Sequence, residues 1–531
     1  MGRTLSSIPY HSPDQARLKR SLLRAHEAHE GAADARDSSE LLASLRELER
    51  SLSSLMSALR LAELRVQEAG AQQAYYQSEI DRLQPLEDEL KTARQKLYAP
   101  LLHSRDLAMV ARQTGPLFLY RRQNDELFNG AEPGEQAGAA SINTDDTMTK
   151  ELTEVLTAPA PRASGPAIPL EVFLDEAISE RSDYASRYGF SNFNEVAWLL
   201  RERFDYGLAD AEQLRKQIVT YFVPIAYAYR SYWSQEPKAL FFPDLEERHY
   251  HRSPVFHSKA SLQELAEHFA AAWPAIDLNH VIFDLDREGG AVTELKRTPL
   301  EGGRTILLQG SLGYSHRDIH ELWRSLADIM VHQTLTKSSW LSENRRPTPA
   351  IQSAIRESTA LLMALDSSAI PIWGTEAASC LLQQMIWDRF FKLMGCAMLD
   401  DYEDRLYNHP HYSITERRDL WTQVAGQYWP GTVSQYDYSF FPWRYGTTIK
   451  EFLNHPAGSR HDELMGILVA FQCLDLEQQK AGTGYDACAN LIADSGRFPF
   501  RSLQDISGLP ALFRDECLKR LAYQIAFALG L

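Results

Sequence analysis

The chain has little cysteine, and its five residues of that type stand apart. They are Cys380, Cys396, Cys473, Cys488 and Cys517, and no two of them form a C-x-x-C pair. So sparse and odd a set excludes a disulfide framework and favours reduced thiols in a cytoplasmic protein. No run of about 18 apolar residues occurs, which excludes an ordinary membrane-spanning helix. The first twenty residues show no apolar stretch after their basic residues, so we expect no secretory signal and a cytoplasmic location.

Basic residues are also in deficit. The 55 Lys and Arg are outnumbered by 71 Asp and Glu, which gives a formal net charge of −16. Nucleic acids and anionic membranes select basic surfaces, so neither is an expected partner. The 531 residues, with 44% hydrophobic and 10% aromatic content, predict one large globular body with an accessory region.

Periodicity along the chain predicts mainly helices. Residues 1–128 carry a leucine stripe from Leu41 to Leu59 and another from Leu83 to Leu97, with Pro85 and Pro100 as breaks. We interpret this as a helical hairpin packed on the main body; a free coiled coil is the alternative. Residues 129–169, rich in Gly, Ala, Pro and Thr, predict a linker-like crossing. Residues 170–531 predict a helical domain in which the runs 280–286 and 304–311 form a small β-hairpin.

One stretch, "HRDIHELWRSLADIMVH", carries polar residues at intervals of four. His316 and His320 have the spacing that lets two imidazoles on a helix hold one metal ion. Glu321 follows, but Arg324 stands where the motif H-E-x-x-H needs its second histidine, and a guanidinium disfavours a cation. The alternative is a polar stripe in which Arg324 pairs with Asp328 or Glu321.

Other histidines and aromatics are weaker candidates for a site. "ERHYHRSPVFH" (247–257) and "NHPHYS" (408–413) favour surface loops over metal sites, the second before a helix capped by Thr415. The segment 429–449, "WPGTVSQYDYSFFPWRYGTTI", is the densest in aromatics. It predicts either core packing or the wall of a peptide-binding cleft, because each tyrosine offers a flat apolar face and a hydroxyl.

The order of these segments resembles the oligoendopeptidase F and thimet oligopeptidase family of zinc metallopeptidases. The resemblance runs from about residue 170 to 525 and rests on "RSDYASRYGFSNFNEVAWLLRERFDY", "LLQGSLGYS", "QYDYSFFPWRYGTTI" and "YDACANLIADSGRFPFRSLQDISGL". It implies a thimet-oligopeptidase-like clamshell of helices with an internal channel, zinc held by two histidines and a glutamate, and the motif glutamate as general base.

The catalytic positions depart from that pattern. Alignment on "LLQGSL" puts His320 and Glu321 on the first His and the Glu, with Arg324 on the second His. Alignment on Asp318 and Ile319 instead puts Arg324, Ser325 and Asp328 on His, Glu and His. In both, an arginine replaces a zinc ligand. Glu357 is the carboxylate in reach as third ligand. If the protein is active, His320, Glu321 and Glu357 are its catalytic candidates, and His316, His320 and Glu357 its candidates for zinc or another divalent metal.

The tyrosine-rich segment departs as well. Gln435 falls on a family His, and Phe441 and Trp443 fall on family tyrosines, whereas Tyr445 is kept. We therefore predict a pseudopeptidase without a cofactor that binds a peptide or peptide-like ligand. The candidate ligand-binding residues are Arg324, Gln435, Tyr436, Tyr438, Trp443 and Tyr445.

Two alternatives stay open. One is an enzyme with rewired chemistry in the same fold, using an altered metal site or metal-free acid–base catalysis on a peptide or small metabolite. The other is a scaffold whose N-terminal helices dock a partner protein or a second copy.

Overall fold

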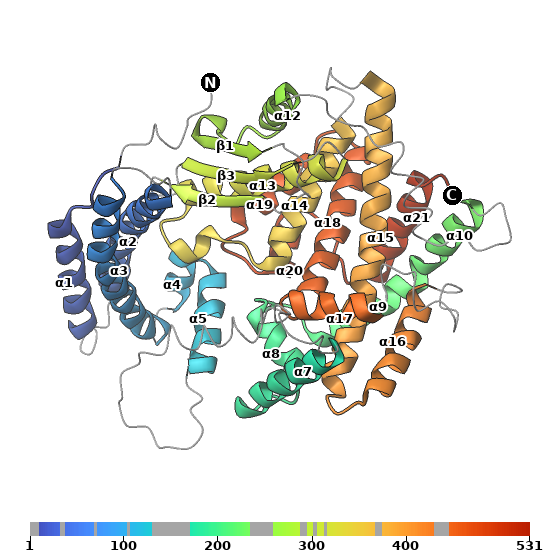
Figure 1. The fold of residues 1–531 in the computed structure, drawn as a ribbon, viewed down its shortest axis with the longest axis horizontal. Coiled ribbons are helices and arrows are strands. Elements are labelled where there is room, and N and C mark those ends of the chain that lie inside the picture. Colours follow the sequence, from blue (N-terminus) through green and yellow to red (C-terminus); the bar gives the residue numbers. More distant parts are fainter. Residues whose placement is uncertain are drawn as a thin grey trace. The chain divides into compact units, whose positions relative to one another are not determined.

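The computed structural model describes residues 10–31, 38–67, 72–103, 107–129, 170–233, 259–286, 295–300, 305–312, 316–366, 374–429 and 445–531. As expected, it is mainly helical with one small sheet (Figure 1). Within these ranges, no helix combines the length and the apolar character needed to cross a bilayer. The predicted crossing at 129–169 lies almost wholly outside the described residues.

The chain divides into two compact units that do not follow chain order. Unit 1 comprises residues 1–123, 255–347 and 492–498, and unit 2 comprises 124–254, 348–491 and 499–531. Residues 255–347, expected to belong to one C-terminal helical domain, group instead with the N-terminal helices. Sequence order alone could not show this, because the chain enters each unit more than once.

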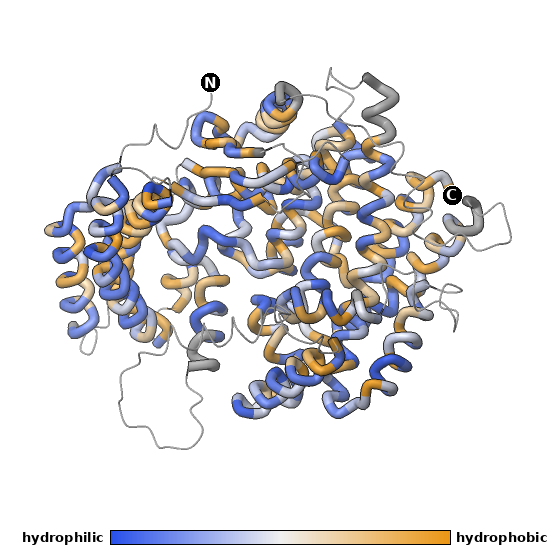
Figure 2. The backbone as a smooth tube through the Cα atoms, in the orientation of Figure 1, coloured by the Kyte–Doolittle hydropathy of each residue, from blue (hydrophilic) through white to orange (hydrophobic). Residues whose placement is uncertain are grey.

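Unit 1 begins with the predicted long helices, namely α1 (Gln15–Gly31), α2 (Ser38–Gln67), α3 (Gln73–Leu102) and α4 (Leu107–Thr114), and with the first half of α5 (Pro116–Asn129), which continues into unit 2. Hydrophilic and hydrophobic residues alternate along α1–α3 (Figure 2). The two leucine stripes are buried in one shared core. Pro85 and Pro100 were wrongly interpreted as breaks, since both lie inside α3. A proline costs a helix one hydrogen bond, and the buried Leu83, Leu86 and Leu101 offset that cost by packing.

A three-stranded sheet follows in unit 1. Its strands are β1 (Val281–Asp286), β2 (Lys296–Leu300) and β3 (Thr305–Ser311), in the order β1-β3-β2. The two predicted runs form β1 and β3, but these pair in parallel, with Val281 opposite Ile306. The antiparallel neighbour of β3 is β2, which was not predicted. Ile282, Leu300 and Leu307 pack with Leu61 of α2 in a small core.

The remaining elements of unit 1 come before and after the strands along the chain. They are α12 (Lys259–Ala272), the short 3-10 helix η2 (Leu278–His280), α13 (His316–Ser338) and the 3-10 helix η4 (Ser342–Arg345). Helix α13 carries the histidine stretch of the sequence. Its apolar residues Ile319, Leu322, Trp323 and Leu326 are completely buried, so this helix is a core element with one polar stripe.

The described residues of unit 2 form helices and loops without a strand. Its helices are α7 (Leu170–Arg187), α8 (Phe193–Leu200), α9 (Leu208–Tyr221), α10 (Val223–Trp233), α14 (Pro349–Leu365), α15 (Gly374–Asn408), α16 (Ile414–Tyr428), α17 (Tyr445–Asn454), α18 (Ser459–Gln479), α19 (Thr483–Asp494), whose last residues belong to unit 1, α20 (Phe500–Ile506) and α21 (Asp515–Ala528). Helices α14 and α18 approach so closely at Gly466 that any larger residue there would collide with Ser353. The cap of α16 is Ser413, in a capping box with Glu416, not Thr415 as predicted.

Candidate functional site

The histidine stretch forms the first turns of α13 in unit 1. His316 and His320 are buried, with 1% and 5% of their surfaces exposed. Glu321 and Arg324 lie at the edge of the core with side-chain exposures of 17% and 21%, and they form an ion pair with Arg324 Nη1 3.1 Å from Glu321 Oε2. The Ser325 hydroxyl donates to the other Glu321 oxygen at 3.5 Å. The glutamate that the resemblance marks as general base is therefore bound by Arg324, which the same resemblance aligns with a zinc ligand.

Asp328 and His332, which follow in the polar stripe of α13, have other partners. Asp328 is bonded by Arg297 of β2, with an Nη1–Oδ2 distance of 2.6 Å. The same nitrogen lies 3.5 Å from the Ser325 hydroxyl. His332 Nε2 lies 3.5 Å from the hydroxyl of Thr336, one turn further along. In neither alignment register does this stripe offer three metal ligands, because its carboxylates bind arginines.

Glu357, the candidate third ligand, lies in α14 of unit 2. It is 1% exposed. Nη1 of Arg389, from α15, lies 3.2 Å from one oxygen of Glu357 and 3.1 Å from the other. Arg389 was not singled out in the sequence, and the 32 residues that separate it from Glu357 gave no signal of the pairing. Each carboxylate that the resemblance assigns to the zinc chemistry thus has its own arginine, Glu321 in one unit and Glu357 in the other.

These residues do not fit a bound zinc ion. A zinc site needs donor atoms that are free to coordinate and a negative or neutral ligand set. Both carboxylates here are engaged by guanidinium groups. In the described part of the chain, no three or more His, Cys, Asp or Glu side chains gather as a metal would require. The roles assigned to His316, His320 and Glu357 stay predictions.

Most of the tyrosine-rich segment 429–449 lies outside the described residues. Gln435, Tyr436, Tyr438 and Trp443 lie outside the described residues, as do the histidines at 249, 251 and 257. Tyr445 is the first residue of α17 and is 8% exposed. Its ring meets Trp421 of α16 edge to face, with 6.2 Å between centroids, and the Arg418 guanidinium lies 5.7 Å from its centroid. Tyr445 is thus a packing residue of unit 2.

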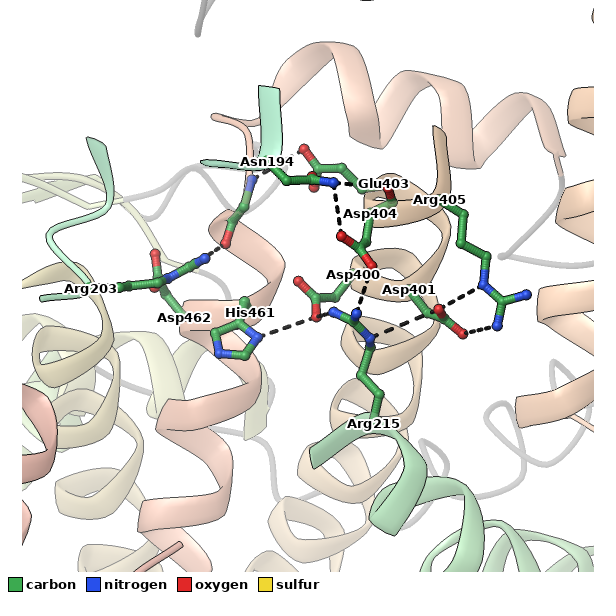
Figure 3. A network of polar contacts seen from close by, with 11 residues as sticks. Asn194, Arg203, Arg215, Asp400, Asp401, Glu403, Asp404, Arg405, His461 and Asp462 are labelled. Atoms are coloured by element: carbon green, nitrogen blue, oxygen red, sulfur yellow. Dashed lines mark hydrogen bonds and ion pairs between the residues drawn. The ribbon is translucent and has the colours of Figure 1, made fainter. Parts of the chain in front are cut away.

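Sequence reasoning missed a network of polar contacts in unit 2, which is drawn in Figure 3. It is built on "LDDYEDR", the stretch 399–405 of α15. Arg215 of α9 reaches this helix from 185 residues away and lies 2.8 Å from Asp400 and 2.8 Å from Asp404. His461 of α18 lies 3.2 Å from the same Asp400 carboxylate through Nδ1.

A second group of contacts extends this cluster. Asp462 lies 2.8 Å from Arg203 and 2.5 Å from Arg201. Arg203 also donates to the carbonyl of Gly458, whose N–H donates to Glu403 at 3.1 Å. Gly458 has a positive φ of 71°, the left-handed conformation that glycine adopts without strain.

Burial sets the ionisation of this cluster. Burial disfavours the charged form of Asp400, but His461 and Arg215 favour that form more strongly. They hold the pKa of the Asp400 carboxyl well below its usual range. Burial lowers the pKa of His461. Glu403 differs, because burial outweighs the nearby Arg181 and raises its pKa to about 7. Four acidic residues in five positions, 400–404, were the available sequence signal, but an acidic run is usually a solvated face.

The fold is that of a class of helical peptidases. No family model matches the chain, and no curated protein matches it in sequence. In three dimensions it is similar over 99% of both chains to PZ peptidase A solved with an inhibitor, with a TM-score of 0.72 and 16% identity. Two proteins assigned as oligoendopeptidase F follow. One gives a TM-score of 0.69 at 17% identity and covers 100% of this chain and 99% of its own.

The other, from Bacillus anthracis, gives a TM-score of 0.67 at 15% identity and covers 99% of this chain and 98% of its own. Identities this low show the fold and leave the activity open. The chain therefore has the fold of the oligoendopeptidase F and PZ peptidase group over its full length.

Proposed function

We propose that this protein is a pseudopeptidase that binds a peptide or peptide-like ligand without zinc-dependent cleavage. One observation carries the proposal. Both carboxylates that the resemblance assigns to catalysis and zinc binding are ion-paired with arginine, Glu321 with Arg324 and Glu357 with Arg389. A carboxylate held by a guanidinium is a poor metal ligand, because its oxygen is already engaged and the guanidinium repels a second cation.

The ligand class follows from the fold and from Arg324. The fold is shared with a peptidase solved with an inhibitor, so a peptide is the first ligand to test. Arg324 is 21% exposed on its side chain, and its Nη1 lies 3.1 Å from Glu321 Oε2. A guanidinium in this setting recognises a carboxylate, such as the C-terminus or an acidic side chain of a peptide.

Two measurements on the purified full chain test the proposal. A mixture of synthetic peptides of about four to twelve residues is equilibrated with the protein by dialysis, and mass spectrometry identifies retained and cleaved peptides. Zinc titration followed by calorimetry measures metal affinity. We expect retained, uncleaved peptides and no zinc binding tighter than about 10 µM, the range of adventitious sites.

Matched variants on one helix sharpen the result. Arg324→Glu reverses the charge at the proposed contact, whereas Arg317→Glu makes the same change at an exposed position of α13. Peptide retention should fall at least tenfold for the first variant and stay within about twofold for the second. Zinc-dependent cleavage by the wild-type chain contradicts the loss of activity, and absence of any retained peptide contradicts the ligand.

A further inference from the structure

Three helices of unit 2, α15, α18 and α21, line a cavity that the peptidase resemblance does not use. Each of the three packs on the other two (Figure 1). The cavity holds about 450 Å³ and is open to solvent on one side. This volume lies within the range of small-molecule sites, so a ligand of the size of a nucleoside can enter it.

The lining of the cavity carries no unbalanced charge. Among its lining residues, all of which lie in the described ranges, only Asp475 is ionisable, and it is 2% exposed. Nη2 of Arg520 lies 2.9 Å from Asp475 Oδ2, and the amide nitrogen of Gln479 donates to the same oxygen at 2.9 Å. A charged ligand would meet no free opposite charge among these residues. The cavity therefore favours an uncharged ligand.

Three primary amides line the cavity from three different helices. They belong to Gln383 of α15, Gln478 of α18 and Gln524 of α21. Within the described part of the chain, none of these side chains has a hydrogen-bond partner. A primary amide presents an acceptor oxygen beside two N–H donors. It can therefore bind a flat ligand edge that carries a donor next to an acceptor.

Apolar side chains and one exposed ring complete the lining. Ile386 is 2% exposed and belongs to the core. Phe527, in contrast, is 74% exposed and follows Gln524 by three residues on α21, so the two lie on the same face of that helix. A ring that stays open to solvent beside a cavity offers a stacking surface to a flat ligand.

Nucleobases combine these requirements, because they are flat, uncharged and edged with adjacent donors and acceptors. A glutamine amide binds adenine through both its atoms, donating to N7 and accepting from the N6 amino group. We propose that this cavity binds the adenine base of an uncharged nucleoside, stacked on Phe527 and hydrogen-bonded by the Gln524 amide. Phosphate groups and nucleic acid are not part of the ligand, since the lining has no free cation and the chain has a net charge of −16.

Calorimetric titration of the full chain with adenosine tests the site. We expect a Kd of about 0.1–1 mM for a ligand of this size. N6,N6-dimethyladenosine keeps the ring but lacks both donors of the amino group, so it should bind at least tenfold more weakly. Adenosine monophosphate brings negative charge toward Asp475 and should bind no more tightly than adenosine. No binding of adenosine at about 5 mM, equal binding of the dimethyl compound, or tighter binding of the monophosphate overturns the proposal.

A peptide amide has the same donor–acceptor edge without an aromatic ring. N-acetylalaninamide is therefore titrated in parallel and should bind at least tenfold more weakly than adenosine. Equal affinity for the two compounds would assign the cavity to amide groups in general and overturn the assignment to a nucleobase.

Two aromatic residues of α21 provide matched variants. Phe527→Ala removes the proposed stacking ring and should weaken adenosine binding at least fivefold. Tyr523→Ala makes a similar change at a ring that is 73% exposed and does not line the cavity, and should alter the Kd by less than about twofold. Both rings are largely exposed, so both variants should fold, which circular dichroism checks. Equal losses of affinity in the two variants contradict stacking on Phe527.

The amide contact has its own variant. Gln524→Met keeps the length of the side chain but removes the amide, and Gln213→Met makes the same change at an exposed position of α9 outside the cavity. We expect at least fivefold weaker adenosine binding in Gln524→Met and a smaller preference for adenosine over its dimethyl derivative. An unchanged preference contradicts the contact. Peptide retention, which is assigned to Arg324 in unit 1, should be normal in all these variants, so the two proposals fail separately.

Discussion

Arg324 of α13 and Arg215 of α9 each lie beside carboxylates, but in different surroundings. Arg324 is 21% exposed and binds Glu321, three residues earlier on its own helix. Arg215 is 7% exposed and binds carboxylates on α15, across 185 residues of chain. Local, partly exposed pairs contribute little to stability, whereas removing one member of a buried network leaves uncompensated charge.

The difference indicates what each arginine does. A buried, long-range network holds helices of unit 2 together, so its residues serve the fold. The pair of Arg324 with Glu321 lies within one helix at the edge of the core, and a pair of that kind adds little to stability. Under the proposed function, Arg324 serves ligand binding. The following substitutions test this contrast, from the largest expected effect to the smallest.

Replacing Arg215 by methionine should destabilise the protein most. Asp400, which is buried, and Asp404, which is 24% exposed on its side chain, would lose the cation 2.8 Å away and repel each other. We expect a loss of about 3–5 kcal/mol in the free energy of unfolding, measured by urea denaturation. Lys216→Met, at the adjacent position with 65% exposure, is the control and should cost less than about 0.5 kcal/mol. A similar, small loss of stability in both variants would show that the buried network and the exposed pair contribute equally.

Replacing Arg389 by methionine should have the next largest effect. Glu357 would remain with 2% of its side chain exposed and without the cation 3.1 Å away. A loss of about 2–4 kcal/mol is expected in the same assay. The double variant Glu357→Gln, Arg389→Met should recover part of it, since no charge is then left buried. A double variant that is less stable than the single one would show that the pair itself is strongly stabilising.

The pKa of Glu403 is raised whereas that of its neighbour Asp400 is lowered, so the two carboxylates should affect the pH dependence of stability in opposite directions. The pKa of Glu403 is raised from 4.5 to about 7, so the native state binds more protons than the unfolded state between these values. Its contribution to stability is present below pH 4.5 and is lost as pH rises through 7. We expect Glu403→Gln to gain about 1–2 kcal/mol relative to wild type between pH 5 and pH 8, by urea denaturation at both values. Parallel pH profiles would contradict this.

Replacing Arg324 by alanine should affect stability least. The substitution removes the partly exposed pair with Glu321, and we expect the free energy of unfolding to change by less than about 1 kcal/mol. Peptide retention should nevertheless fall at least tenfold. A loss above about 3 kcal/mol would assign Arg324 to the fold and remove the main reason for a binding role.

Local patterns were sufficient for much of the architecture. The leucine stripes of α2 and α3, the helix around His316 and Glu321, and strands β1 and β3 all follow from periodicity and strand-forming residues. The breaks predicted at Pro85 and Pro100 failed because packing overrode a local rule. Strand β2 was missed because "KRTPL" contains a proline and charged residues, and its register depends on β3.

The site was predictable only in part. The prediction that Arg324 takes the place of a zinc ligand followed from either alignment register, because an arginine does not coordinate zinc. The partner of Glu357 was not, since Arg389 lies 32 residues away with no spacing rule to connect them. The cluster around Asp400 was hidden for the same reason, as its cations come from α9 and its histidine from α18.

The sequence by itself determined the helical class and the long N-terminal helices, because these depend on neighbours within a few positions. Only the tertiary structure decided which arginine binds which carboxylate, how the chain divides into two units, and which acidic residues are buried. Burial and charge pairing arise when distant segments meet. A run such as "LDDYEDR" is a solvated face or a buried network according to what packs against it.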